Sequence, residues 1–193
     1  MNKNTFFIFS IIFFFNCDGK SQVELFPEYE FRYLENLVSE EVMFSPFSIK
    51  IPNGFNKFNK KNLDILKNQI ENDSVSYFSK KLIHVFSDSL NTAFIISGIK
   101  DNNLLKRLDN DYKNYLNKTN EAVVKNQYSV NDIKAVQYQT KKNINNISFT
   151  NLKIFLINGD FGNYLLDFII IDRNFNDKLY SIESSLSTLA RRK

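Results

Sequence analysis

Two apolar segments near the C-terminal end limit most strongly what this chain folds into: ISFTNLKIFLI (147–157) and YLLDFIIID (164–172). The loop between them, NGDFGN (158–163), holds two glycines and two asparagines, so the pair predicts a β-hairpin. The second segment is apolar at consecutive positions, which is typical of a central strand covered on both faces. We therefore expect a sheet that is packed on both sides, with Phe168 and Ile170 buried.

Apolar periodicity predicts the other elements around this hairpin. Further strands are expected at residues 81–88, 92–99, 121–128 and 133–140, and within 47–55, where Pro-Asn-Gly (52–54) ends the strand. Helices are expected at residues 27–42, 63–70, 101–117 and 176–191. Because the strands of the second half follow one another along the chain, the order predicts an α+β fold: an α/β/α sandwich with a central, mostly antiparallel sheet. The last two helices are expected to pack on that sheet.

The most apolar stretch of the chain lies at its start, FFIFSIIFFF (6–15). A membrane-spanning helix needs roughly 20 apolar residues, so this run is too short to span. Lys3 before the run and polar residues after it are typical of a secretory signal peptide. No small-x-small cleavage site precedes Cys17, which is the single cysteine of the chain and follows the run after Asn16.

A cysteine directly after the apolar run resembles the lipobox of bacterial lipoproteins, although Asn16 stands where that family usually has Gly, Ala or Ser. The resemblance implies that residues 1–16 are a signal peptide and that Cys17 carries diacylglycerol, with palmitate-like acyl chains. Two or three such chains hold a protein on a membrane where one does not. An ordinary signal peptide with a free cysteine, or an uncleaved anchor, is the alternative.

The rest of the chain is predicted to be a short tether followed by one domain. Residues 17–24 are predicted to be the lipidated cysteine and the tether, and residues 25–193 a single α+β domain with enough length for a core. The formal net charge of +4 invites a nucleic-acid partner. We expect none, because positive and negative charges alternate along the chain instead of forming a basic block.

The residues needed for common enzyme chemistry are scarce. His84 is the only histidine, and no phosphate-binding glycine loop or G-x-S-x-G motif is present. We therefore predict no catalytic residue, no cofactor and no metal site. A hydrolase that uses a pair of carboxylates stays open, because 21 acidic residues are present.

The aromatic residues offer the only candidate binding surface in the sequence. Most of the 20 Phe and 9 Tyr fall on inward positions of predicted elements, which indicates core packing. Tyr tolerates half-exposure, so four tyrosines form a candidate rim for a ligand or partner, with the edge of the core as the alternative. They are Tyr112, Tyr115, Tyr128 and Tyr138.

Residues 46–193 resemble the PsbP-like family. The resemblance lies in FSIKIPNGF (47–55), in the run of strands through YLLDFIIID, and in YSIESSLSTL (180–189) with its paired serines Ser184 and Ser185. Asn131 and Asp132 replace the glycine that often precedes the middle strand in that family. The family includes extrinsic photosystem subunits, a Ran-binding import factor and bacterial lipoproteins. The resemblance implies an α/β/α sandwich that acts as an accessory or binding module and has no common catalytic residues.

Together these features predict a non-catalytic lipoprotein of the bacterial cell envelope. Its lipid on Cys17 would hold it at the inner or outer membrane, and its domain would bind an envelope protein partner. Two alternatives remain: a carrier or sensor for a small apolar ligand between sheet and helices, and the carboxylate-dependent hydrolase. A cavity between sheet and helices would favour the carrier. The hydrolase would need two acids facing each other in a cleft.

Overall fold

A computed structural model describes residues 26–59, 77–90, 92–112, 114–115, 123–144, 146–158 and 162–192. The strands are β1 (Val38–Phe44), β2 (Phe47–Pro52), β3 (Asn56–Lys57), β4 (Lys80–Ser87), β5 (Ala93–Ile99), β6 (Val123–Val130), β7 (Ile133–Ile144), β8 (Ile147–Ile157), β9 (Asn163–Ile171) and β10 (Ala190–Arg191). The helical elements are the 3-10 turns η1 (Glu35–Leu37) and η4 (Asp172–Asn174), the short helix α2 (Leu104–Arg107) with the π-helical turn η2 (Leu108–Tyr112), and helix α4 (Phe175–Leu186).

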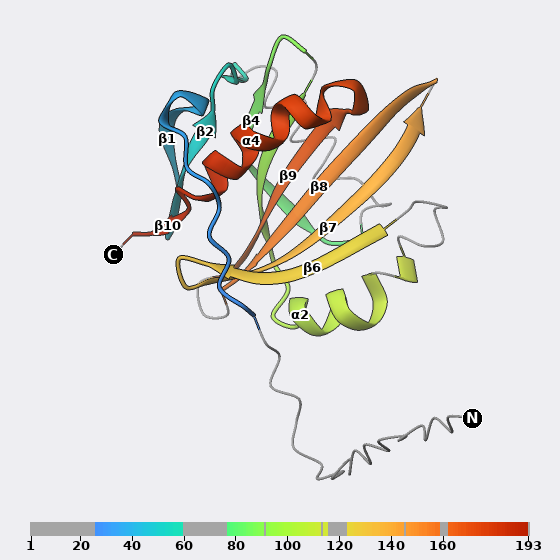
Figure 1. Ribbon diagram of the computed structural model, residues 1–193. Coiled ribbons are helices and arrows are strands. Elements are labelled where there is room, and N and C mark those ends of the chain that lie inside the picture. The colour runs from blue at the N-terminus through green and yellow to red at the C-terminus, as the bar shows by residue number, and fades with distance from the viewer. Residues whose placement is uncertain are drawn as a thin grey trace, which may run out of the picture.

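The main sheet has seven strands in the order β3-β4-β5-β9-β8-β7-β6, and each neighbouring pair is antiparallel. A small antiparallel sheet, β1-β2-β10, lies beside α4 on one side of the main sheet, and α2 lies on the other (Figure 1). The fold is therefore α+β, as the sequence predicted. Strand β9 is the fourth of the seven, which confirms the central place predicted for YLLDFIIID.

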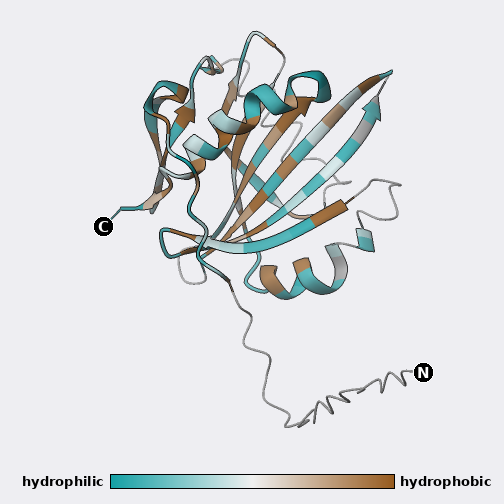
Figure 2. Cartoon of the chain, viewed as in Figure 1, coloured by the Kyte–Doolittle hydropathy of each residue, from teal (hydrophilic) through white to brown (hydrophobic). Residues whose placement is uncertain are grey.

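Each face of the main sheet carries its own core. On the α4 side, the rings of Phe94 on β5 and Phe168 on β9 stack with centroids 4.2 Å apart. On the α2 side, Leu104 and Leu108 pack against Phe155 of β8. Both Phe168 and Ile170 are fully buried, as expected. Figure 2 shows the result: β9 is coloured hydrophobic over most of its length, whereas hydrophilic colour is mixed into β7 and β6.

The helix predicted at residues 27–42 is wrong. Residues 27–34 are extended, η1 is a single turn, and β1 pairs with β2 in a hairpin closed by the Phe44–Phe47 pair. The apolar spacing of the segment fits a helix, but Val38 and Val42 are β-branched and lie opposite residues of β2, so the strand pairing prevails. The strand predicted within 47–55, with its end at Pro-Asn-Gly, is confirmed as β2, which ends at Pro52.

The last helix ends earlier than predicted. Helix α4 begins at Phe175 but ends at Leu186, and Ala190 and Arg191 form β10 against β2. Two hydroxyls at the end of α4 bond to carbonyls of the preceding turn: Ser187 Oγ donates to Ser184 O at 2.7 Å, and Thr188 Oγ1 donates to Ser185 O at 2.6 Å. Such hydroxyls compete with the helical hydrogen bonds, which explains the early end.

The remaining predicted elements are present with shifted bounds. The helix predicted at 101–117 begins at Leu104 and continues as a π-helical turn, and β7 extends to Ile144. The strands predicted at 81–88, 92–99, 121–128, 147–157 and 164–172 correspond to β4, β5, β6, β8 and β9. The helix predicted at 63–70 lies outside the described residues. Among the described helices, none has the length and apolar composition needed to cross a membrane.

Candidate functional site

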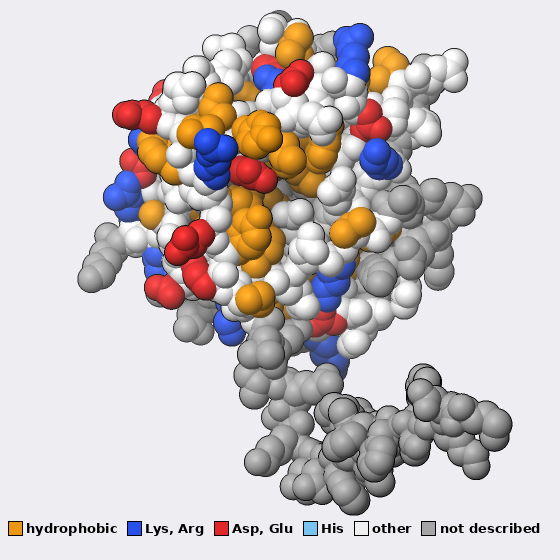
Figure 3. All heavy atoms as spheres, in the orientation of Figure 1, with side chains coloured by type: hydrophobic (Ala, Val, Ile, Leu, Met, Phe, Trp, Pro, Cys, Tyr) orange, Lys and Arg blue, Asp and Glu red, His pale blue; other side chains and the backbone are white. Residues whose placement is uncertain are grey.

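Helix α4 leaves part of its face of the main sheet uncovered. The helix packs on β2 and β9, while β8, β7 and β6 extend beyond its side (Figure 1). Here a groove of about 430 Å³ lies between α4, the sheet and the N-terminal extended segment. Figure 3, in the same orientation, shows hydrophobic side chains gathered on this face of the molecule. We call this feature the α4 groove. Its volume falls within the range of about 300–1,000 Å³ that is usual for ligand sites.

One wall of the α4 groove is the apolar stripe of the helix. Phe175, Leu179, Ile182 and Leu186 follow one another at intervals of three and four residues, so they share one side of α4. Ile182 and Leu186 are buried, whereas Phe175 and Leu179 keep part of their surface exposed. Leu152 of β8 lies in the floor below them. The wall is therefore anchored in the core and still offers apolar surface to a ligand.

Three aromatic rings line one end of the α4 groove. The ring centroids of Tyr29 and Phe31 are 4.6 Å apart, and the ring of Tyr128 lies 5.9 Å from the first and 5.5 Å from the second. The N-terminal segment is held there by the edge of β6. Tyr29 N donates to Ser129 O at 2.8 Å, and Ser129 N donates to Pro27 O at 2.9 Å. These bonds fix the aromatic end of the groove to the sheet.

The two tyrosines of this end differ in exposure. Tyr29 is 51% exposed and Tyr128 is 6% exposed. Burial raises the pKa of Tyr128, and the hydroxyl of Tyr29 adds to the effect. Tyr128 therefore stays neutral at physiological pH, and its hydroxyl donates to Gln137 Oε1 at 3.0 Å. This bond orients an amide in the floor of the groove.

The floor and rim of the α4 groove are polar but almost uncharged. Amide side chains come from two neighbouring strands: Asn126 from β6, and Gln137 and Gln139 from β7. Among the residues that the structure describes, Glu183 of α4 is the only charged one in its lining. An amide both donates and accepts hydrogen bonds. The groove thus combines an apolar wall with a row of neutral hydrogen-bonding groups.

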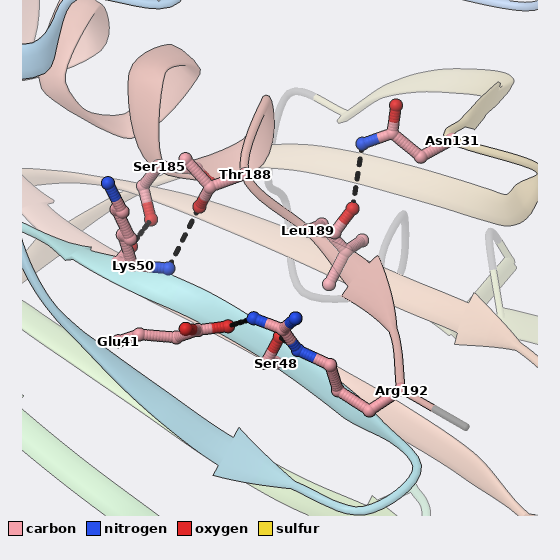
Figure 4. A network of polar contacts seen from close by, with 8 residues as sticks. All are labelled: Glu41, Ser48, Lys50, Asn131, Ser185, Thr188, Leu189 and Arg192. Atoms are coloured by element: carbon pink, nitrogen blue, oxygen red, sulfur yellow. Dashed lines mark hydrogen bonds and ion pairs between the residues drawn. The ribbon is translucent and has the colours of Figure 1, made fainter.

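Hydrogen bonds on both sides hold the C-terminal end of α4, the helix that forms one wall of the groove. Asn131, in the β6–β7 turn, donates from Nδ2 to Leu189 O at 2.7 Å (Figure 4). On the opposite side, Ser185 Oγ donates to Lys50 O of β2, and Lys50 N donates to Thr188 Oγ1 at 2.8 Å. The helix end is therefore joined to the main sheet and to the small sheet by separate bonds.

The last described residue completes this attachment. Arg192 donates from Nε to Ser48 Oγ at 2.9 Å and pairs through its second terminal nitrogen with Glu41 (Figure 4). The hydrogen bond with Ser48 and then the hydrogen bond with Arg192 lower the pKa of Glu41. The strand β10 is thereby held on β2, and α4 has a fixed end from which its apolar stripe faces the groove.

The structure separates the four candidate rim tyrosines. Tyr128 lies at the α4 groove, but the other three lie on the α2 side of the sheet. There Tyr138 is fully buried and donates to Leu108 O at 2.7 Å, Tyr112 is 5% exposed, and Tyr115 stacks on Tyr112 with centroids 6.0 Å apart. Burial raises the pKa of Tyr138, and so does the negative charge of Asp109. These three tyrosines belong to the core on the α2 side of the sheet and to its edge. Cys17 lies outside the described residues.

The sequence pointed to only one residue of the α4 groove, Tyr128. The residues that line it come from segments as far apart as 27 and 186, so the sequence order hides them. One signal was present: Gln137 and Gln139 alternate with Val136 and Tyr138 on β7, which puts both amides on one face. That they face the α4 core follows only from the pairing of Gln137 with Ile154 and of Gln139 with Leu152.

Other features of the described residues give weaker evidence for a functional site. His84 contacts a backbone carbonyl through Nε2, 2.9 Å from Met43 O. No three His, Cys, Asp or Glu side chains among the described residues lie close enough to hold a metal ion. A depression of about 500 Å³ beside α2 is lined mainly by polar and charged residues of the surface, among them Asn102, Asn103 and Asp109.

No protein-family model and no curated protein sequence matches this chain. Several solved structures are similar to it. A protein of Bacteroides thetaiotaomicron VPI-5482 has 14% identity and a TM-score of 0.44 over 77% of this chain, which spans 46% of that protein's length. LpqN, involved in cell envelope biogenesis of Mycobacterium tuberculosis, has 8% identity and a TM-score of 0.42 over 76% of this chain and 83% of LpqN.

The cyanobacterial PsbP protein CyanoP, from Synechocystis sp. PCC 6803, is similar over more of its length. It has 11% sequence identity and a TM-score of 0.53, over 80% of this chain and 93% of CyanoP. At this identity the similarity is one of fold. The antiparallel sheet with helices on both faces, described above, is the architecture that the two share. The chain therefore has a PsbP-like fold.

Proposed function

We propose that this chain is a non-catalytic binding module of the bacterial cell envelope, anchored through lipid on Cys17, and that its ligand site is the α4 groove. The observation that carries the proposal is the groove itself. Partly exposed apolar side chains of α4 and three aromatic rings face a row of amides in a cleft of about 430 Å³. Apolar walls with a few placed polar groups are typical of ligand sites.

The chemistry of the groove supports binding over catalysis. A hydrolase based on two carboxylates needs both acids in one cleft, whereas Glu183 is the only acid that the described part of the chain contributes to the lining of this groove. The hydroxyl of Tyr128, the buried tyrosine at the site, keeps its proton and serves as a hydrogen-bond donor to Gln137. The described residues of the groove are suited to orienting and contacting a ligand, and they include no nucleophile paired with a base.

The place in the envelope rests on the sequence of residues 1–17. The apolar run before Cys17 supports export, and the cysteine after it supports lipid attachment. The described domain begins at Phe26, one residue before Pro27, which lines the groove. The nine residues between Cys17 and Pro27 reach at most about 35 Å when extended. The α4 groove would thus be held close to the membrane that carries the anchor.

A neutral apolar dye tests the groove as a ligand site. The probe is N-phenyl-1-naphthylamine, NPN, whose fluorescence rises in apolar surroundings, titrated into the purified domain. Leu179→Arg places a guanidinium on the apolar wall and should weaken NPN binding by about tenfold or more. Tyr180→Arg is the matched control, because Tyr180 is the next residue on α4, is 54% exposed and lies outside the groove lining.

The proposal expects saturable NPN binding to wild type and to Tyr180→Arg. Both variants should keep the wild-type circular dichroism spectrum. If wild type fails to bind NPN, or if Leu179→Arg binds it as well as Tyr180→Arg does, the α4 groove is not the ligand site.

A further inference from the structure

We propose that the ligand of the α4 groove is an extended peptide segment with apolar side chains, held above β7 through hydrogen bonds between its backbone and the amides of Gln137 and Gln139. This inference rests on the proposed function, because it names the ligand class of the same site. Three features of the groove lead to it: the spacing of the amides, their hydrogen-bonding state and the charge of the lining.

The spacing of the amides matches an extended backbone. Gln137 and Gln139 are two residues apart on β7, so both project from the same face, about 6.6–6.8 Å apart along the strand. Carbonyl groups of alternate residues in an extended peptide repeat at the same distance. A segment lying along β7 therefore meets both amides in register. A polyproline II segment repeats every three residues at about 9.3 Å and does not.

The amides have hydrogen-bonding capacity to offer. Gln137 lines the groove, and its Oε1 accepts from the Tyr128 hydroxyl, which leaves its NH₂ group to act as a donor. Within the part of the chain that the structure describes, the amide of Gln139 makes no hydrogen bond. A peptide supplies carbonyl and N–H groups for such amides. An acyl chain would cover them without a partner, and burying an unpaired polar group is unfavourable.

The apolar wall accounts for the side chains of the peptide. Successive side chains of an extended segment point to opposite sides, so alternate side chains would face the stripe of α4 that includes Leu179. Glu183 is the only charged residue in the described lining of the groove. A neutral or basic segment suits this charge, and an acidic segment is repelled by it. The recognised chemistry is thus a neutral or basic, apolar, extended peptide.

Displacement of NPN tests the ligand class. The probes are capped pentapeptides, acetyl-Lys-X-Ala-X-Ala-amide with X as Leu, Val or Phe, and, for comparison, the neutral lipid 1-monopalmitoylglycerol. Each is titrated into the domain loaded with NPN. The variant Gln139→Leu removes one amide and keeps a side chain of similar size. The control Thr140→Val alters the next residue of β7, which is buried on the opposite face.

The two ligand classes predict opposite effects of Gln139→Leu. For a peptide, the loss of the amide raises the peptide dissociation constant by about tenfold, calculated from the displacement curve with the NPN affinity measured separately for each variant, while Thr140→Val keeps the wild-type peptide affinity. For a lipid, the added apolar surface strengthens displacement. The inference is overturned if no pentapeptide displaces NPN, or if Gln139→Leu leaves the peptide dissociation constant at the wild-type value. In either case NPN binding itself still supports the groove as a ligand site, and only its absence removes that proposal too.

Discussion

Lys178 of helix α4 and Asp88 of the β4–β5 turn form an ion pair in which Nζ lies 2.6 Å from Oδ2. The side chain of Asp88 is 2% exposed and that of Lys178 is 15% exposed, so the pair is largely shielded from water. Asp88 Oδ1 also accepts from the backbone N–H groups of Leu90 at 2.9 Å and Thr92 at 2.8 Å. The pair holds the N-terminal half of α4, and with it the wall of the α4 groove, on the main sheet.

Acid should weaken this attachment. Burial raises the pKa of Asp88, but the hydrogen bonds from Lys178, Thr92 and Leu90 outweigh it, so the net pKa lies below its ordinary value. A carboxylate with a lowered pKa stabilises the fold above its unfolded pKa of about 4, and this contribution is lost as pH falls through the folded value. Asp88→Asn should lower the free energy of unfolding by about 1.5–3 kcal/mol at pH 7.

Thermal unfolding, followed from neutral to acid pH, measures the contribution of Asp88 to stability. The difference in Tm between wild type and Asp88→Asn should be largest at neutral pH and should shrink as pH falls below about 4, because the unfolded chain binds a proton at Asp88 there before the folded protein does. Glu40→Gln, at an exposed position of β1, is the control and should change little at any pH. A Tm difference that grows on acidification would contradict the role given to Asp88.

The stacked rings of Phe94 and Phe168 should dominate the stability of the α4-side core. Both rings are fully buried, and their planes are only 6° from parallel. Phe168→Ala removes the stack and leaves a cavity in the central strand, so it should cost about 3–5 kcal/mol in urea unfolding. Leu90→Ala is the control because Leu90 is 46% exposed, and its effect should stay within about 0.5 kcal/mol. Similar losses for the two variants would show that the core is not where we place it.

The β6–β7 turn depends on left-handed backbone at two successive residues. Asn131 has φ +48° and Asp132 has φ +63°, the arrangement of a type I′ hairpin turn. Asn131→Gly keeps this conformation and removes only the side-chain bonds to Ser187 O and Leu189 O. Asn131→Ala removes the bonds and adds strain, so it should be less stable than the glycine variant by about 1 kcal/mol. Equilibrium unfolding in urea measures both, and the reverse order would contradict the turn conformation.

The anchor is tested by fractionation of cells that express the full chain. Wild type should be recovered with membranes and should incorporate radiolabelled palmitate. Cys17→Ala should lose the label and leave the membrane fraction, because the acyl chains supply the attachment. Ser21→Ala, in the predicted tether, is the matched control and should behave as wild type. Equal partitioning of wild type and Cys17→Ala would show that the protein is not a lipoprotein.

The sequence predicted the parts of the fold whose signals are local. The apolar run of β9 leaves no polar face, so its central place follows from composition alone. The segment 27–42 shows the limit: its apolar spacing suits a helix, but the partner strand β2 decides its conformation. The end of α4 could be predicted only by weighing the hydroxyls of Ser187 and Thr188 against helix propensity.

The α4 groove was beyond the reach of sequence reasoning for a different reason. Its wall, floor and aromatic end belong to α4, β7 and the N-terminal segment, which are brought together only by the order β9-β8-β7-β6 in the sheet. Four tyrosines were equally good candidates in the sequence. Strand parity separates them, because Tyr128 of β6 lies across from Ala135 on the α4 side, while Tyr138 of β7 points to the α2 side.

The most direct test of the α4 groove as the ligand site is methyl NMR of the domain titrated with NPN. The two cores on opposite faces of the sheet provide an internal comparison within one sample. Binding in the groove should shift the methyl resonances of Leu152, Leu179 and Ile182 and leave those of Leu104 and Leu165, in the α2-side core, unchanged. Shifts centred on the α2-side methyl groups, or no saturable shift at the three groove residues, would contradict the account.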